Sequence, residues 1–119
     1  MIKLTAMEMV LAYLTAKDKD EAQALAQGLL EKRLVACVNI FEGMKSLYWW
    51  KGKIEESQEA VLVLKTRADK IEGLNEWVKK NHSYECPCVL ILPIQGGNPD
   101  YLNWLNLELN SKSSEGTYE

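Results

Sequence analysis

The residues with the clearest chemistry are one histidine and two cysteines that lie close together in the second half of the chain. His82 is the only histidine, and its imidazole is a good ligand for Cu²⁺ or Zn²⁺. Cys86 and Cys88 flank Pro87, and residues two apart in an extended chain point to the same face. Such a pair of thiols could bind a soft ion such as Cu(I). Two interpretations of the segment follow: a structural loop histidine with thiols that act as small hydrophobic side chains, or a metal site, for which the spacing of about 6.5–7 Å between Cα atoms two apart in a strand is awkward.

The composition indicates one folded domain and argues against several classes of partner. Of the 119 residues, 47% are hydrophobic and 26% are charged, a balance typical of globular proteins. The 17 acidic and 14 basic residues give a formal net charge of −3. We therefore expect no nucleic acid as a partner, because phosphate binding needs a basic patch. No apolar run approaches the roughly 20 residues that span a bilayer, so we expect no membrane association.

The cysteine content bears on the compartment. Three cysteines are too few for a disulfide framework, which indicates a reducing environment. The segment Met1–Ala6 has no long apolar region and does not resemble a signal peptide. We therefore expect a cytoplasmic protein. We also expect residues 1–6 to be an extension, 7–109 a single domain and 110–119 a polar, disordered tail.

The apolar periodicity predicts the element order β-α-β-β-α-β, followed by one more helix. Asp18 and Asp69, each followed three residues later by Glu, are the predicted caps of the first two helices. Asn98, followed by Pro99, is the predicted cap of the third. The predicted strands are 7–15, 34–50 with a bend or bulge at Gly43, about 54–66, and 89–93.

This order is the split-βαβ arrangement of an α+β, ferredoxin-like sandwich, in which both helices cover one face of an antiparallel sheet. The other face needs a different cover, because segments 60–64 and 89–92 are apolar at both parities. The central hairpin would extend about 45–55 Å, whereas a globule of this size has a radius of gyration of about 13–14 Å. Its tip, Leu47–Trp50, would be an exposed apolar patch on a single chain. We therefore expect a closed oligomer.

Several segments at matching spacing make the chain similar to a known family. The chain resembles the CutA divalent-cation-tolerance proteins over roughly residues 7–109. The segments that carry the resemblance are R-L-V-A-C-V-N-I (33–40), S-L-Y-W-W-K-G-K-I (46–54), L-V-L-K-T (62–66), H-S-Y-E-C-P (82–87), L-P-I (92–94) and D-Y-L-N-W-L (100–105). The resemblance implies a homotrimer of ferredoxin-like subunits, built like the trimeric PII signalling proteins. It also implies a role in tolerance of copper and other divalent metals, and no enzymatic mechanism.

The resemblance bears on the metal prediction as well. His82 stands in the position of the family's His-Pro-Tyr segment, and the implied metal is Cu or Zn, which is not required for folding. Metal-binding members can carry a cysteine and a second histidine at positions that are Leu14 and Asn81 here. Cys88 stands where the family usually has Glu and is either a site residue or a drifted position. Cys37 is expected in the core.

The resemblance also indicates a cleft between subunits. Lys65, Tyr84 and Glu85 match family positions near that cleft, where they could hold a small anionic or zwitterionic ligand. They could equally form an intersubunit ion pair. The expected anchors of the trimer interface are the aromatic residues at the hairpin tip, Tyr48, Trp49 and Trp50.

No motif in the sequence favours an enzyme. Acylphosphatases share the predicted topology but need a Gly-rich loop with Arg after the first strand, and the segment T-A-K-D-K-D (15–20) has no Gly. RNA-recognition modules share the topology too, but this chain is acidic and lacks their aromatic strand. Two hypotheses follow: a metal-binding tolerance protein, or a PII-like small-molecule sensor or scaffold without a dedicated metal site.

Overall fold

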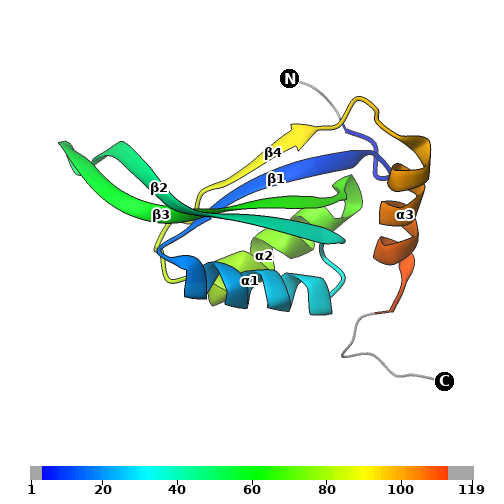
Figure 1. The fold of residues 1–119 in the computed structure, drawn as a ribbon, viewed down its shortest axis with the longest axis horizontal. Coiled ribbons are helices and arrows are strands. Elements are labelled where there is room, and N and C mark those ends of the chain that lie inside the picture. Colours follow the sequence, from blue (N-terminus) through cyan, green and yellow to red (C-terminus); the bar gives the residue numbers. More distant parts are fainter. Residues whose placement is uncertain (1–3, 113–119) are drawn as a thin grey trace.

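The computed structural model describes residues 4–112 of the chain. A four-stranded antiparallel sheet in the order β2-β3-β1-β4 carries helices α1 and α2 on one face, and α3 lies at one end (Figure 1). The elements are β1 (Met9–Ala16), α1 (Lys19–Glu31), β2 (Cys37–Trp50), β3 (Lys53–Arg67), a short 3-10 helix (Ala68–Lys70), α2 (Ile71–Asn81), β4 (Val89–Pro93) and α3 (Pro99–Asn110). The predicted α+β, ferredoxin-like order is confirmed.

The terminal predictions fall mostly outside the described residues. Positions 1–3 of the expected extension and 113–119 of the expected tail lie outside them. Asn110, the first residue of the expected tail, is the last residue of α3. Within residues 4–112, no helix is long and apolar enough to cross a membrane.

The hydrophobic core lies between the sheet and the pair α1 and α2. Even-numbered side chains of β1 and β3 point to these helices, because side chains alternate across a strand. The helices contribute residues at helical spacing, which explains why the apolar periodicity predicted both kinds of element. The fully buried strand residues of this cluster are Ala12, Leu14, Ala16, Leu62 and Leu64, and the helices add Ala22, Leu25, Leu29, Leu74 and Val78.

The two predicted helix caps from aspartate have different outcomes. The Asp18 carboxylate accepts a hydrogen bond from the backbone N–H of Glu21 at 2.8 Å, so the α1 cap is confirmed. The Asp69 cap is wrong, because α2 begins at Ile71 without a side-chain cap. Arg67 is buried and needs a counter-charge. Its guanidinium donates to both Asp69 oxygens, at 2.7 and 3.0 Å.

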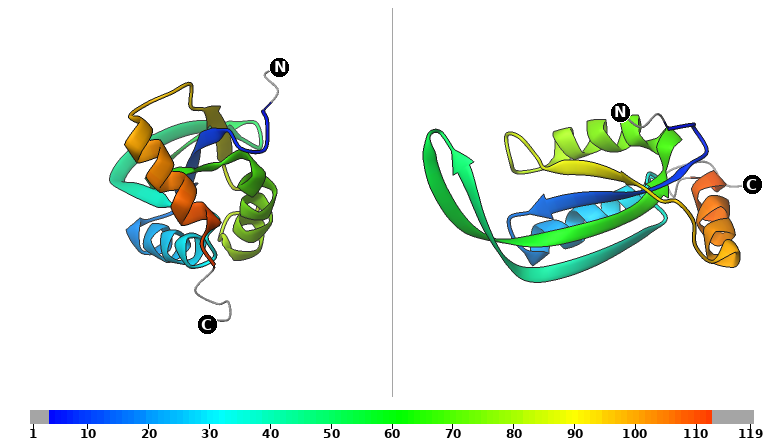
Figure 2. Two further views of the ribbon diagram at one scale, coloured as in Figure 1. Left: turned by 90° about the vertical axis from the view of Figure 1, so that its right-hand side faces the viewer. Right: turned by 90° about the horizontal axis from the view of Figure 1, so that it is seen from above.

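The central hairpin is long and bent. The register of β2 and β3 extends from Cys37 opposite Lys65 to Trp50 opposite Lys53, and a two-residue turn closes it. A bulge between Phe41 and Met44 shifts the register, and Gly43 within it has a φ of 72° that few other residues adopt. The hairpin tip and α3 lie at opposite ends of a molecule whose longest extent is 50 Å (Figure 2).

The second face of the sheet is covered by α3 at one end, where Lys65 and Arg67 contact that helix, and is otherwise open in the single chain. It carries the odd-numbered residues of β1 and β3 and the even-numbered residues of β4. Phe41, Leu90 and Leu92 are exposed there, and Trp49 near the hairpin tip is 72% exposed. The predicted need for cover from outside the chain is therefore present in the structure.

Two arginines hold α3 against the rest of the fold. Arg67 donates to the side-chain oxygens of Asn106 and Asn110, at 2.6 and 2.8 Å. Arg33 donates to the carboxylate of Glu108 at 2.6 Å. Leu105 and Leu109 of α3 are buried. The third helix is therefore a structural part of the domain.

Candidate functional site

A cavity of about 660 Å³ opens on the uncovered side of the sheet, between the loop that follows α2 and the outer part of the hairpin. β1 contributes Tyr13 and Thr15 to its lining. The loop contributes Tyr84, Glu85 and Cys86, and Cys88 follows just before β4. The hairpin adds Met44, Tyr48, Trp50 and Glu59 among others. The cavity therefore joins three parts of the chain that are far apart in sequence.

The bulge in β2 sets which face of the hairpin each residue beyond Gly43 occupies. Phe41 pairs with Val61, and two residues further along an unbroken ladder residue 43 would oppose Glu59. Met44 takes that place instead. Even-numbered β2 residues beyond Gly43 therefore share the face of Glu59. This shift places Met44, Tyr48 and Trp50 at the cavity.

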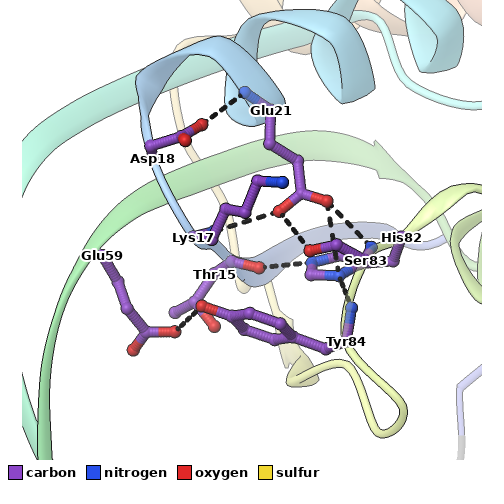
Figure 3. Close-up of polar contacts among 8 residues, drawn as sticks. All are labelled: Thr15, Lys17, Asp18, Glu21, Glu59, His82, Ser83 and Tyr84. Atoms are coloured by element: carbon purple, nitrogen blue, oxygen red, sulfur yellow. Dashed lines mark hydrogen bonds and ion pairs between the residues drawn. The ribbon is translucent and has the colours of Figure 1, made fainter.

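His82 fixes the loop beside this cavity. Its side chain is fully buried. The backbone N–H of Tyr84 donates to its Nδ1 at 3.0 Å, so the ring proton must sit on Nε2, which donates to the carbonyl of Thr15 at 2.7 Å (Figure 3). Both ring nitrogens are in use within the chain. This geometry favours the structural role for His82 over the predicted metal ligation.

Glu21 holds the other side of the same loop. Its carboxylate accepts from the backbone N–H of Lys17 at 3.0 Å, and from the hydroxyl and backbone N–H of Ser83 at 2.9 and 2.8 Å (Figure 3). Burial opposes ionisation of Glu21, but these hydrogen bonds outweigh it and lower the pKa of the carboxyl group. Sequence reasoning identified Glu21 only as a capping partner, because Ser83 lies 62 positions away.

Tyr84 joins the loop to the hairpin. Its hydroxyl donates to the Glu59 carboxylate at 2.6 Å (Figure 3). Burial, followed by this hydrogen bond and the charge of Glu59, raises the pKa of Tyr84 well above its ordinary value, so the hydroxyl keeps its proton. Tyr84 and Glu85 both line the cavity within one chain, whereas the prediction placed them at a cleft between subunits. Glu59 was missed, because no local pattern distinguishes it from the neighbouring glutamates.

Lys65 does not join Tyr84 and Glu85 within the chain. Its ammonium donates to the Tyr101 hydroxyl at 3.2 Å and lies 5.3 Å from the centroid of that ring, next to α3. The hydrogen bond to Tyr101 raises the pKa of Lys65. Within one subunit, Lys65 therefore does not lie with Tyr84 and Glu85. The cavity is lined by the carboxylates of Glu59 and Glu85, and Lys65 is not part of it.

The three cysteines separate into two places. Cys86 is exposed and Cys88 half-buried, and both line the cavity. Burial first, then the charges of Glu59 and Cys86, raise the pKa of Cys88. Cys37 is half-buried opposite Lys65, on the face away from α1 and α2 and outside the core cluster, so its prediction as a core residue is wrong.

The positions implied by the family resemblance offer no further ligands. Leu14 is fully buried in the core, and the Asn81 amide donates to the carbonyl of Trp77 at 2.8 Å. Within residues 4–112, no group of three or more His, Cys, Asp or Glu side chains could hold a metal ion.

The hairpin-tip aromatics lie where the interface prediction needs them. Tyr48, Trp49 and Trp50 are all exposed in the single chain. Tyr48 and Trp50 face the cavity, whereas Trp49, between them, points to the opposite side of the ribbon. Lys51 lies 5.9 Å from the centroid of a Trp50 ring. These residues remain the predicted interface anchors.

Comparison with known proteins decides the family. The sequence profile of the family described as "CutA1 divalent ion tolerance protein" matches residues 10–108, which lie inside the predicted domain. The chain belongs to this CutA family. The relatives are named for tolerance of divalent cations rather than for an enzymatic activity.

Individual CutA relatives agree with the family match. "Protein CutA 1, chloroplastic" of Oryza sativa is 43% identical over 101 residues, which cover 85% of this chain and 57% of that protein. "Divalent-cation tolerance protein CutA" of Archaeoglobus fulgidus is 45% identical over 94 residues, which cover 79% of this chain and 91% of that protein. The chain spans between 57% and 62% of the length of its rice, Xenopus laevis and mouse relatives.

The fold agrees as well. The crystal structure of CutA1 from Oryza sativa superposes with a TM-score of 0.84 at 41% identity, covering 87% of this chain and 94% of that one. The recognition of the CutA family from short segments is thus confirmed.

Proposed function

We propose that this CutA-family chain acts in divalent-cation tolerance as a cytoplasmic homotrimer that binds copper or another divalent metal ion under metal stress. The observation that carries the proposal is the match of residues 10–108 to a family named for divalent ion tolerance. The proposed location rests on the low cysteine content.

The trimeric part of the proposal is supported by the uncovered apolar surface. Phe41, Leu90 and Leu92 lie on one open face, and the hairpin extends Trp49 and Ile54 into solvent. An apolar surface of this kind on a soluble chain marks an interface. A ring of identical subunits, each arm lying on the open face of a neighbour, would cover both surfaces with one repeated contact.

Sedimentation of the purified chain tests the assembly. We expect a species of about three times the 13.6 kDa chain mass at about 1 μM protein. Substitution Trp49→Ser should weaken this species, whereas Lys53→Ser at the same tip is the matched polar control. A folded, stable 13.6 kDa species at micromolar concentration would contradict the trimer.

Isothermal titration of the same material with Cu²⁺ and Zn²⁺ tests the metal-binding part. We expect saturable heat for at least one ion. Because both nitrogens of His82 are hydrogen-bonded, we expect His82→Ala to keep that heat while lowering stability. Loss of the heat in His82→Ala would instead assign the imidazole site, and absence of heat in the unmodified chain would contradict divalent binding.

A second candidate function is a PII-like small-molecule sensor. The observation in its favour is the cavity of about 660 Å³, which lies within the usual range for ligand pockets. Titration with a panel of nucleotides tests it. Heat with a nucleotide and none with metals would favour the sensor over the tolerance protein.

A further inference from the structure

Three of the residues that line the cavity carry sulfur, and they come from two distant segments. Met44 comes from β2, and Cys86 and Cys88 come from the chain between α2 and β4. The two cysteines are separated only by Pro87, whereas the methionine lies more than 40 positions earlier. Only the fold brings it to the same cavity.

The position of Met44 follows from the bulge. The extra residue at Gly43 turns Met44 to the side of Glu59, so its thioether faces the cavity instead of the core. The Tyr13 hydroxyl donates to the Met44 sulfur at 3.5 Å. A thioether sulfur has two lone pairs, so one is left for another partner.

The two thiols are held in place by the surrounding loop. His82 is anchored to Thr15, and Tyr84 to Glu59, so the chain that enters the Cys-Pro-Cys segment is fixed at two points. Pro87 restricts the backbone between the thiols. Cys86 is exposed and Cys88 is half-buried, which gives an ion a path from solvent to the inner thiol.

The ligand chemistry selects the class of metal. Thiolates and thioethers are soft ligands that favour Cu(I), whereas harder divalent ions prefer imidazole and oxygen. The described residues offer no cluster of three His, Cys, Asp or Glu side chains for such divalent ions. Met44 adds a thioether to the two cysteine thiols that line the same cavity.

We propose that Met44, Cys86 and Cys88 form a Cu(I) site in each subunit. The proposal deepens the metal-binding function proposed above and rests on it for its cellular role, but its ligands all come from one chain. Both thiols lose their protons when the ion binds, so affinity falls as the pH is lowered.

Anaerobic competition for Cu(I) against a chromogenic chelator tests the site in the full chain. We expect one Cu(I) per chain and a thiolate-to-copper absorption band in the ultraviolet. Cys86→Ser and Cys88→Ser should each weaken binding by more than about tenfold, because loss of even an outer partner of a ligand costs that much. Met44→Leu, which keeps the side-chain volume, should weaken it by a smaller factor.

Cys37→Ser is the matched control, because Cys37 is the remaining cysteine and does not line the cavity. Circular dichroism of each variant checks that it is folded. The inference is overturned if the unmodified chain does not compete for Cu(I), or if Cys37→Ser weakens binding as much as Cys86→Ser.

Two further readouts separate this inference from the proposed function. Cu²⁺ or Zn²⁺ heat that persists without any Cu(I) binding overturns the sulfur site and leaves divalent binding intact. Cu(I) binding that requires both cavity cysteines, in a chain that sediments as a monomer, supports the site and contradicts the trimer.

Discussion

On one face of the sheet, Leu14 and Leu62 are fully buried against α1 and α2, whereas on the other face Leu90 and Leu92 are 57% and 48% exposed. All four are leucines on neighbouring strands of one sheet. Their burial differs because the chain has two crossover helices, and right-handed crossovers put both on the same face of the sheet. The covered face is completed within the chain, and the open face leaves room for a cavity and for another subunit.

The largest effect on stability is expected from shortening a buried side chain on the covered face. Leu14→Ala removes a fully buried side chain and should lower the free energy of unfolding by about 2–5 kcal/mol. Leu90→Ala on the open face is the matched variant and should change secondary structure little while weakening self-association. Urea unfolding and sedimentation at equal protein concentrations measure both. Equal unfolding costs for the two leucines would break the distinction between the faces.

A smaller effect is expected where α1 meets α2. Gly28→Ala normally favours a helix, but here the added Cβ would collide with the Trp77 ring. We expect a loss of about 1–3 kcal/mol, typical of overpacking. The double variant Gly28→Ala with Trp77→Leu should recover part of the loss in thermal unfolding. A gain in stability from Gly28→Ala alone would show that the helices are not closely packed.

The hydrogen bonds between Glu21 of α1 and Ser83 of the loop should make the free energy of unfolding depend on pH. The pKa of Glu21 is lowered in the folded chain, so its contribution is present above the ordinary carboxyl pKa and lost as the pH falls through the folded pKa. Glu21→Gln should therefore cost about 1–2 kcal/mol near pH 7 and progressively less below about pH 4. Unfolding curves of both proteins across this range measure the difference. A cost that does not change with pH would exclude a role for the charge.

The smallest effect is expected at the cavity on the open side. Tyr84→Phe removes the hydrogen bond to Glu59 but keeps the ring, and should cost about 1 kcal/mol. Because the hydroxyl joins the loop to the hairpin, we expect faster amide hydrogen exchange in residues 82–86 and unchanged exchange in α1. Tyr101→Phe, which loses the contact to Lys65 at the other end of the sheet, is the control and should leave the loop unaffected.

Much of the architecture could be predicted from the residues alone. The order β-α-β-β-α-β, the bulge at Gly43 and the caps at Asp18 and Asn98 all depend on residues close together in the chain. The Asp69 cap failed because the competing partner, Arg67, is buried. Burial of a charge depends on tertiary packing, and no local pattern reveals it.

The candidate site could be predicted only in part. Tyr84, Glu85, Cys86 and Cys88 do line one cavity, and they come from one short segment. Lys65 is absent from it, because its strand position places it near α3. Glu21, Glu59 and Met44 were missed, since their partners are separated from them by 62, 25 and 31 positions.

The sequence alone determines the secondary structure and the alternation of apolar residues, because both follow from the local periodicity of the chain. The need for cover from outside the chain follows from the same periodicity and from the length of the hairpin. Which polar side chains meet, and what chemistry they then offer, depends on strand register, on a single bulge residue and on the position of one loop. A shift of one residue in a strand exchanges its two faces. The cavity that Met44 shares with Cys86 and Cys88 in this CutA-family chain therefore exists only in the folded molecule.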